Sequence, residues 1–146
     1  MGALARLAEL GIELPPEPKP GGVYVPAVRT GNLVYTSGQV DLSSSGKVGA
    51  EVSAADAKAT ARRCALNALA AVDALVGLDS VVRVVKVVGF VASAPGFTDQ
   101  PGVINGASEL LGEVFGEAGA HARSAVGVAE LPLGVPVEVE LIVEVR

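Results

Sequence analysis

The chain has 146 residues, a length typical of one domain that buries roughly 68–70% of the surface its unfolded chain exposes. Half of the residues are hydrophobic but only 3% are aromatic, so Val, Ala and Leu have to build the core. The net charge of -5 argues against a nucleic-acid partner, and a single cysteine cannot form an internal disulfide, which indicates a reducing, cytoplasmic setting.

The apolar stretches do not predict a membrane partner or export. No run of about 18 uncharged apolar residues exists, so we expect no transmembrane helix. Arg6 and Glu9 interrupt the N-terminal apolar stretch, and no small-residue cleavage pattern follows it, so we expect no signal peptide.

The first 22 residues are expected to lie outside the main domain, which we place at 23–146. The leucines of Ala3–Leu10 predict a short helix that Gly11 ends. Leu14–Gly22 contains four prolines and two glycines, which indicates an extended connector laid over the domain.

Two strands and a turn are expected next. Val23–Val28 and Leu33–Thr36 have strand composition, and Gly31-Asn32 between them is typical of a hairpin turn. Ser37-Gly38-Gln39 is expected to end the second strand.

Two helices are predicted around one long strand. Ser53 followed by Asp56 resembles a capping box with Asp in place of Glu, and it predicts a helix that runs to about Val76. Val81–Ala92 is rich in β-branched residues and predicts a buried strand. A second helix is expected over about Gly102–Gly116, weakened by its internal glycines.

The last quarter of the chain predicts two paired strands joined by a tight connection at Leu131–Gly134. On the second strand, valines fill one face while Glu138 and Glu140 lie on the other. A guanidinium among small side chains, beside a strand with carboxylates, indicates a small pocket with one fixed positive charge and a nearby acid. The residues that share this small-residue face of the first strand are Arg123, Ala125, Gly127 and Ala129.

The order β-β-α-β-α-β-β predicts an α+β sandwich, a mixed sheet with both helices on one face. The other face of such a Val-rich sheet cannot remain exposed to water. We therefore expect a homo-oligomer that packs these faces together, with any pocket at the seam between copies.

Several stretches together resemble one known family. They are Tyr24, TGNLVYTSGQV at Thr30–Val40, Asn105, and ARSAVGVAELP from Ala122 followed by VEVE from Val137. In this combination the chain resembles the Rid (YjgF-type) reactive intermediate deaminases over about Gly22–Val145. The resemblance implies a chorismate-mutase-like fold and a homotrimer with three clefts between subunits. It also implies cofactor-free hydrolysis of enamines and imines, such as 2-aminoacrylate and 2-iminopropanoate, to 2-oxo acids and ammonia.

The resemblance also implies roles for individual residues. Arg123 stands where the family has its carboxylate-binding arginine, and Glu138 where the family has the glutamate that orients or activates water. Ala125 departs from the best-known deaminases, which carry a cysteine there, and we expect this change to reshape the pocket without abolishing attack by water. The other residues at family cleft positions are Tyr24, Ser37, Gly38 and Asn105.

Plainer interpretations stay open for the same residues. Arg123 could be a structural partner of Glu138 or Glu140, and Glu138 could be a solvated strand residue. His121, the only histidine, is interpreted as a surface residue, with a proton-relay role as the alternative. Cys64 is expected to be a packed core thiol. With one His and one Cys we expect neither a metal site nor a nucleophile–histidine triad.

Three functions follow as hypotheses. The first is deamination of 2-imino and 2-enamino acids. The second is a trimeric protein without catalytic activity that binds a small carboxylate metabolite in its clefts. The third is a nuclease or translation inhibitor, which the acidic composition and the lack of a basic, aromatic-lined surface disfavour.

Overall fold

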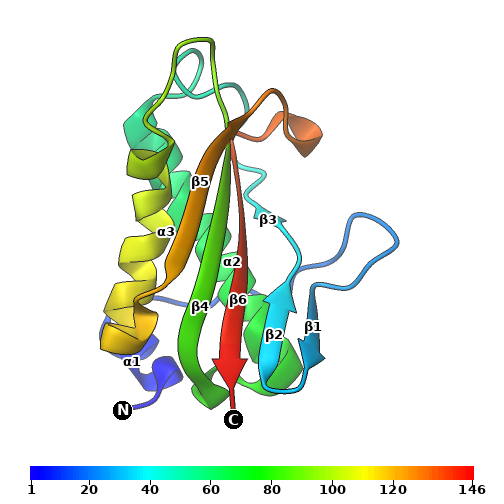
Figure 1. Cartoon of the computed structure of the whole chain (residues 1–146), viewed down its shortest axis with the longest axis vertical. Helices are drawn as coiled ribbons and strands as arrows, with labels where there is room; N and C mark the ends of the chain where they lie inside the picture. Colours follow the sequence, from blue (N-terminus) through cyan, green and yellow to red (C-terminus); the bar gives the residue numbers. More distant parts are fainter.

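The computed structural model describes residues 1–146 and places three helices on one face of a mixed, six-stranded sheet (Figure 1). The strand order is β1-β2-β6-β4-β5, with β3 paired to β6 beside β2. Only β4 and β5 are parallel, and the predicted α+β class is confirmed. The elements are α1 (Ala3–Glu9), β1 (Ala27–Thr30), β2 (Leu33–Thr36), β3 (Gln39–Val40), α2 (Ala54–Val76), β4 (Val81–Ala92), α3 (Gln100–Phe115), β5 (Ala122–Val128) and β6 (Val137–Val145).

Helix α2 begins as its capping residues predict. The Ser53 hydroxyl accepts the backbone N–H of Asp56 at 3.1 Å, and the helix ends before Gly77, whose φ is 82°. The alanines of its inner face are fully buried, so α2 lies close against both the sheet and α3.

Helix α3 contacts α2 through a glycine. A Cβ built on Gly106 would lie 2.0 Å from the carbonyl oxygen of Lys58, so only glycine lets the two backbones approach this closely. A residue that lowers intrinsic helix propensity therefore makes the packing of the helix layer possible.

The predicted pairing of the last two strands is wrong, because β4 lies between β5 and β6. β5 runs parallel to β4, with Arg123 beside Val87, and β6 runs antiparallel along the other side of β4. This arrangement gives the long, Val-rich β4 a paired strand on both sides. If β5 and β6 formed a hairpin, β4 would not need a strand on each side. The 3-10 turn at Pro132–Gly134 therefore belongs to a crossover and not to a hairpin.

The first strand is also shorter than predicted. β1 begins at Ala27 and not at Val23, because Pro26 has no N–H to donate, and Val23 is fully exposed. The β1–β2 turn at Gly31-Asn32 is as predicted, with Thr30 paired to Leu33. The short strand β3, which pairs Val40 with Glu138, was not predicted.

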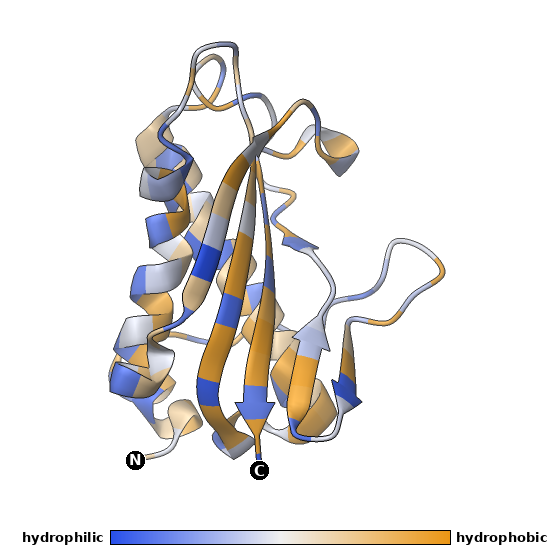
Figure 2. Cartoon of the chain, viewed as in Figure 1, coloured by the Kyte–Doolittle hydropathy of each residue, from blue (hydrophilic) through white to orange (hydrophobic).

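The two faces of the sheet differ sharply. All odd-numbered residues of β6 are buried beneath the helices, while its even-numbered residues are only half-buried on the opposite face. Figure 2 shows the central strands as mostly hydrophobic with isolated hydrophilic residues. Within one chain no element covers the second face, and its exposed apolar side chains include Val28, Tyr35 and Val126. No helix is both long and apolar enough to cross a membrane.

Candidate functional site

A cavity of about 670 Å³ lies beside the N-terminal end of β6. The connector before β1, the segment from Gly38 to Leu42, and the turn before β6 form its walls. Tyr24, Gly38 and Glu138, three of the predicted site residues, line it together. Two exposed leucines, Leu42 and Leu133, add apolar surface at its rim.

Close packing around Gly38 positions the Glu138 carboxyl group. A Cβ at Gly38 would lie 2.7 Å from the carboxyl carbon of Glu138, so any larger residue would displace the acid. Ser37 does not reach the cavity through its hydroxyl, which instead donates to the carbonyl of Val25 at 2.6 Å. The Tyr24 hydroxyl accepts the backbone N–H of Gly21 at 3.1 Å, and this bond shapes the connector.

The Glu138 carboxyl group has a raised pKa. Its burial, with a smaller contribution from the neighbouring charge of Glu140, raises the pKa of the Glu138 carboxyl above its ordinary value. A carboxyl group whose pKa moves toward neutrality can accept a proton from water and later return it.

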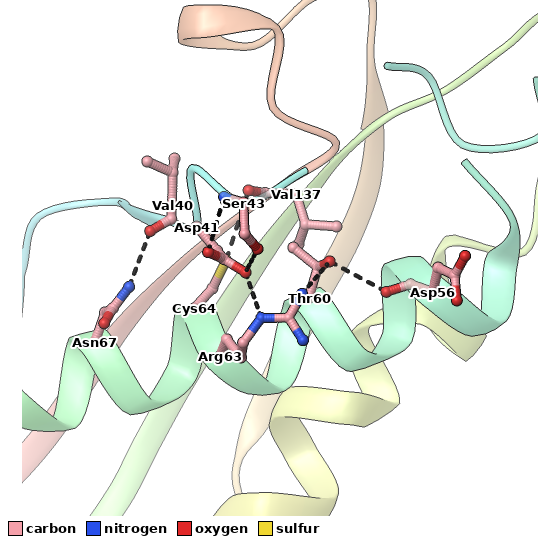
Figure 3. Close-up of polar contacts among 9 residues, drawn as sticks. All are labelled: Val40, Asp41, Ser43, Asp56, Thr60, Arg63, Cys64, Asn67 and Val137. Carbon is pink, nitrogen blue, oxygen red and sulfur yellow. Dashed lines mark hydrogen bonds and ion pairs between the residues drawn. The ribbon is translucent and has the colours of Figure 1, made fainter. Parts of the chain in front are cut away.

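The segment 40–42, which lines the cavity, is held to α2 by polar contacts (Figure 3). Asn67 donates to the carbonyl of Val40 at 2.9 Å, and Arg63 forms an ion pair with Asp41. Asp41 also accepts the backbone N–H and the hydroxyl of Ser43, at 3.1 and 2.9 Å. These contacts fix β3 and the turn that follows it.

Cys64 lies behind this wall as a structural residue. It is fully buried, and burial together with the nearby Asp41 charge raises the pKa of its thiol to about 12. The thiol therefore remains protonated and unreactive, as the prediction of a packed core thiol requires.

Arg123 lies outside this cavity, on the edge strand β5, which β4 separates from β6. Its Nη1 donates to Oδ1 of Asn105 at 2.8 Å and to Oγ of Ser108 at 3.2 Å, both on α3. None of the five ion pairs of the chain involves Arg123. Arg123 is therefore not a structural partner of Glu138 or Glu140 within the chain, and its charge is uncompensated.

The surroundings of Arg123 are small and polar. Ala125 follows on the same face of β5 and packs partly against the core. Ser108 also contacts Nε2 of His121 at 2.9 Å, and Nδ1 of His121 lies 2.6 Å from the carbonyl oxygen of Gly119. His121 is half-buried and hydrogen-bonded through both ring nitrogens, so it is less exposed than its interpretation as a surface residue implied.

One chain does not bring Arg123 and Glu138 together. Cross-strand partners share a face, so Arg123 lies with Val87 on the helix-covered face, whereas Glu138 lies with Phe90 on the open face. Two strand spacings of about 4.8 Å separate their strands laterally. The chain thus carries two candidate groups, which we name the arginine half-site (Asn105, Ser108, Arg123, Ala125) and the acid half-site (Tyr24, Gly38, Glu138). Ser37 belongs to neither through its hydroxyl.

Ser108 was not predicted as a partner of Arg123. Asn105 and Ser108 are three residues apart on α3, a spacing that places both side chains on one face of a helix. The spacing indicates that the two side chains share a face. It identifies them as partners of Arg123 only when α3 is known to cover β5. No group of three or more His, Cys, Asp or Glu residues is placed to hold a metal ion.

Comparison with known proteins identifies relatives across nearly the whole chain. The family model described as Endoribonuclease L-PSP matches residues 15–145. Protein TCP17 of Trypanosoma cruzi is 45% identical in an alignment of 149 positions that covers 97% of this chain and 93% of that protein. The 2-iminobutanoate/2-iminopropanoate deaminase of Dermatophagoides farinae is 35% identical over 135 residues, which cover 92% of this chain and 95% of that protein.

Solved structures share the fold. Atu1372 of Agrobacterium tumefaciens, a protein of unknown function, superimposes with a TM-score of 0.91 at 45% identity, covering 99% of this chain and 92% of that one. E. coli TdcF, solved with bound serine, superimposes with a TM-score of 0.63 at 29% identity, covering 89% and 93% of the two chains.

Proposed function

The chain belongs to the Endoribonuclease L-PSP (YjgF/Rid) family, and we propose that it hydrolyses reactive 2-imino and 2-enamino acids to 2-oxo acids and ammonia. The observation that carries this proposal is the uncompensated guanidinium of Arg123, held on an edge strand by two neutral acceptors. A relative named as a 2-imino acid deaminase, and another solved with a bound amino acid, support a carboxylate-bearing substrate.

The two half-sites suit the two parts of such a substrate. A guanidinium binds a carboxylate through two parallel, charge-assisted hydrogen bonds that fix both its position and its plane. The imine carbon next to that carboxylate is the electrophile, and the attacking water needs a base. Glu138, whose pKa is raised, is the group that acts as this base.

The proposed reaction conserves atoms without a cofactor. Glu138 as carboxylate takes a proton from water while the water oxygen adds to the carbon of the nitrogen-protonated imine, which forms a carbinolamine. Glu138 then returns that proton to the amino nitrogen, the carbon–nitrogen bond breaks, and ammonia leaves. The hydroxyl proton of the carbinolamine passes to the Glu138 carboxylate and from there to ammonia, so that the hydroxyl becomes the 2-oxo group and the carboxylate is restored. General acid–base catalysis of this kind contributes typically about 10²–10⁴-fold to a rate.

We further propose that the working site forms between copies of the chain in a homotrimer. The arginine half-site lies on the β5 edge of the sheet, and the acid half-site lies toward the opposite edge, so the copies of a ring can contact each other head to tail. Such a ring brings Arg123 of one copy to Glu138 of the next. Ala125 leaves the space beside the guanidinium open to the substrate.

The direct test generates 2-iminopropanoate in situ and traps the remaining imine with semicarbazide. Wild-type protein is expected to consume the imine before it is trapped, whereas Arg123→Ala and Glu138→Gln are expected to leave trapping at the level without protein. Arg29→Ala and Glu144→Gln, which alter an arginine and a glutamate of the sheet outside the half-sites, serve as matched controls and are expected to keep activity.

The same preparation separates the alternatives. Equal trapping in all samples, with pyruvate bound by wild type but not by Arg123→Ala, identifies a binding protein without this activity. Degradation of added RNA that is insensitive to both substitutions would instead support an endoribonuclease. The net charge of -5 opposes that outcome because binding the RNA backbone requires clustered positive charge.

A further inference from the structure

The guanidinium of Arg123 ends a chain of hydrogen bonds that begins at the backbone. Nδ1 of His121 lies 2.6 Å from the carbonyl oxygen of Gly119, and Nε2 lies 2.9 Å from Oγ of Ser108. Oγ of Ser108 in turn lies 3.2 Å from Nη1 of Arg123. Except for Gly119, which is buried, the members of this chain are half-buried at the start of β5 and on the facing side of α3.

The chemistry of the groups fixes the direction of each bond. A carbonyl oxygen only accepts, so Nδ1 of His121 carries the proton that it donates to Gly119. In the neutral imidazole Nε2 is then an acceptor, and Ser108 has to donate its hydroxyl proton to it. Oγ of Ser108 therefore accepts from Arg123, and every hydrogen bond in this series joins one donor to one acceptor.

The consequence for Arg123 concerns which of its N–H groups remain free. Nη1 carries two N–H groups, and these are taken by Oδ1 of Asn105 at 2.8 Å and Oγ of Ser108. Nε and Nη2 of Arg123 make no hydrogen bond to any other group of the protein. They form the edge of the guanidinium that offers two parallel N–H groups to a carboxylate.

We propose that Ser108 and His121 are positioning residues, which with Asn105 clamp Nη1 of Arg123 so that its Nε–Nη2 edge meets the substrate carboxylate. The inference rests on the proposed role of Arg123 as the carboxylate-binding residue. His121 acts through Ser108, and Ser108 acts through Arg123, so neither needs to touch the substrate.

The two groups that hold Nη1 of Arg123 are electrically neutral. A carboxylate on Nη1 would hold the guanidinium equally well, but its charge would offset that of Arg123 and weaken the attraction for an anion. An amide oxygen and a hydroxyl orient the guanidinium and leave its charge available. A clamped arginine also loses less side-chain entropy when the ligand binds than a free one.

The test measures binding of pyruvate, the 2-oxo acid product, by calorimetry, with the neutral pyruvamide as comparison. Ser108→Ala is expected to weaken pyruvate binding by about 3- to 10-fold and to raise KM with little change in kcat, because the lost contact orients substrate and transition state alike. Pyruvamide binding is expected to change by less than about 2-fold. Ser108→Thr, which keeps the hydroxyl, should restore wild-type affinity, and Ser124→Ala, next to Arg123 but on the exposed face, should leave it unchanged.

Double variants establish the order of action. The effect of His121→Phe is expected to disappear in the Ser108→Ala background, and both effects should disappear when Arg123 is replaced by Ala. In wild type, the two Nη nitrogens of Arg123 should give separate nitrogen NMR signals because rotation is hindered, and these should merge in Ser108→Ala.

The outcomes separate this inference from the proposed activity. Unchanged pyruvate affinity in Ser108→Ala, with affinity lost in Arg123→Ala, overturns the clamp while the deaminase proposal stands. Coupled losses of pyruvate affinity in a protein that shows no imine turnover support the clamp and overturn the deaminase proposal. Pyruvate binding that survives in Arg123→Ala, or is absent from wild type, overturns the inference at its premise.

Discussion

At the scale of single residues, Asp41 is the carboxylate that holds the cavity wall in place. Burial alone raises the pKa of Asp41, but the hydrogen bonds from Arg63 and Ser43 outweigh it and bring the pKa below its ordinary value of 3.8. A carboxyl group whose pKa is lowered by folding stabilises the folded state while it is ionised. That stabilisation is complete above the ordinary value and is lost as the pH falls through the lower, folded-state value.

We therefore predict that Asp41→Asn lowers the free energy of unfolding at pH 7 by about 1–2 kcal/mol. The expected loss is this small because the Arg63 side chain is half-exposed, and solvent screens its ion pair with Asp41. The difference between variant and wild type should shrink in acid, when the wild-type carboxyl group is protonated too. Urea unfolding at pH 7 and near pH ~2 measures both. Glu117→Gln, an exposed acid without an ion pair, serves as control, and a difference independent of pH would contradict the explanation.

Folding shifts the pKa of Glu138 in the opposite direction, and the effect on stability is opposite too. Burial first, and the charge of Glu140 second, raise its pKa, so the folded state disfavours the ionised form that predominates in the unfolded chain. This destabilisation is present above the folded-state pKa and disappears as the pH falls below the ordinary value of 4.5. A group kept in a position that costs stability is typical of a functional site.

Glu138→Gln should accordingly raise Tm at pH 7, by up to roughly 2–4 °C, while it abolishes imine hydrolysis. The gain should vanish in acid, where wild type no longer carries the charge. Thermal unfolding across this pH range is the measurement, with Glu144→Gln on the same strand and face as control. A variant less stable than wild type at pH 7 would show that the carboxylate is structurally required.

At the scale of elements, two glycines of α3 occupy opposite environments. At Gly106 a Cβ would meet the carbonyl oxygen of Lys58 at 2.0 Å, whereas at Gly112 it would meet nothing within 4 Å. In a helix without such contacts, Gly→Ala is stabilising because alanine has less backbone entropy to lose.

The two substitutions should therefore act with opposite signs. Gly112→Ala is expected to stabilise the protein by about 0.5–1 kcal/mol. Gly106→Ala is expected to destabilise it by about 1–3 kcal/mol or more, because α2 and α3 have to separate. Chemical denaturation of both variants gives the comparison, and a stabilising Gly106→Ala would show that the helices shift apart at little cost.

Local elements could be predicted from the sequence because their determinants are local. Ser53 and Asp56 specify the start of α2, and Gly31-Asn32 specifies a turn with its two strands. The pairing of β5 was predicted wrongly because alternation along a strand defines its two faces but not its neighbour. Only the burial of β4 on both sides decides that β5 pairs with it.

The grouping of the candidate site residues could be predicted only in part. Tyr24, Gly38 and Glu138 meet at one cavity, and Arg123 contacts Asn105, so each half-site groups residues that the family resemblance named. The contact of Arg123 with Ser108 depends on how α3 crosses β5, which no sequence pattern encodes.

At the scale of the whole molecule, the two half-sites and the uncovered sheet face suggest the same assembly. Within one chain, Arg123 and Glu138 lie on opposite faces of the sheet, so a contact between them has to be made by different copies. A contact between two different surfaces of the same protein repeats from copy to copy and closes into a ring when the rotation permits it. The exposed Val28, Tyr35 and Val126 supply apolar surface on the face that such a ring can cover.

A site shared between copies predicts that two inactive variants restore each other. Arg123→Ala lacks the guanidinium and Glu138→Gln lacks the acid, but an interface that joins Arg123 from one variant to Glu138 from the other is intact. When equal amounts are unfolded and refolded together, about one quarter of the interfaces in any ring should have this composition, so about one quarter of wild-type imine hydrolysis should return. The double variant refolded with either single variant should remain inactive, since it contributes neither group. If the mixture of single variants also stays inactive although mixed oligomers have formed, Arg123 and Glu138 do not act across an interface.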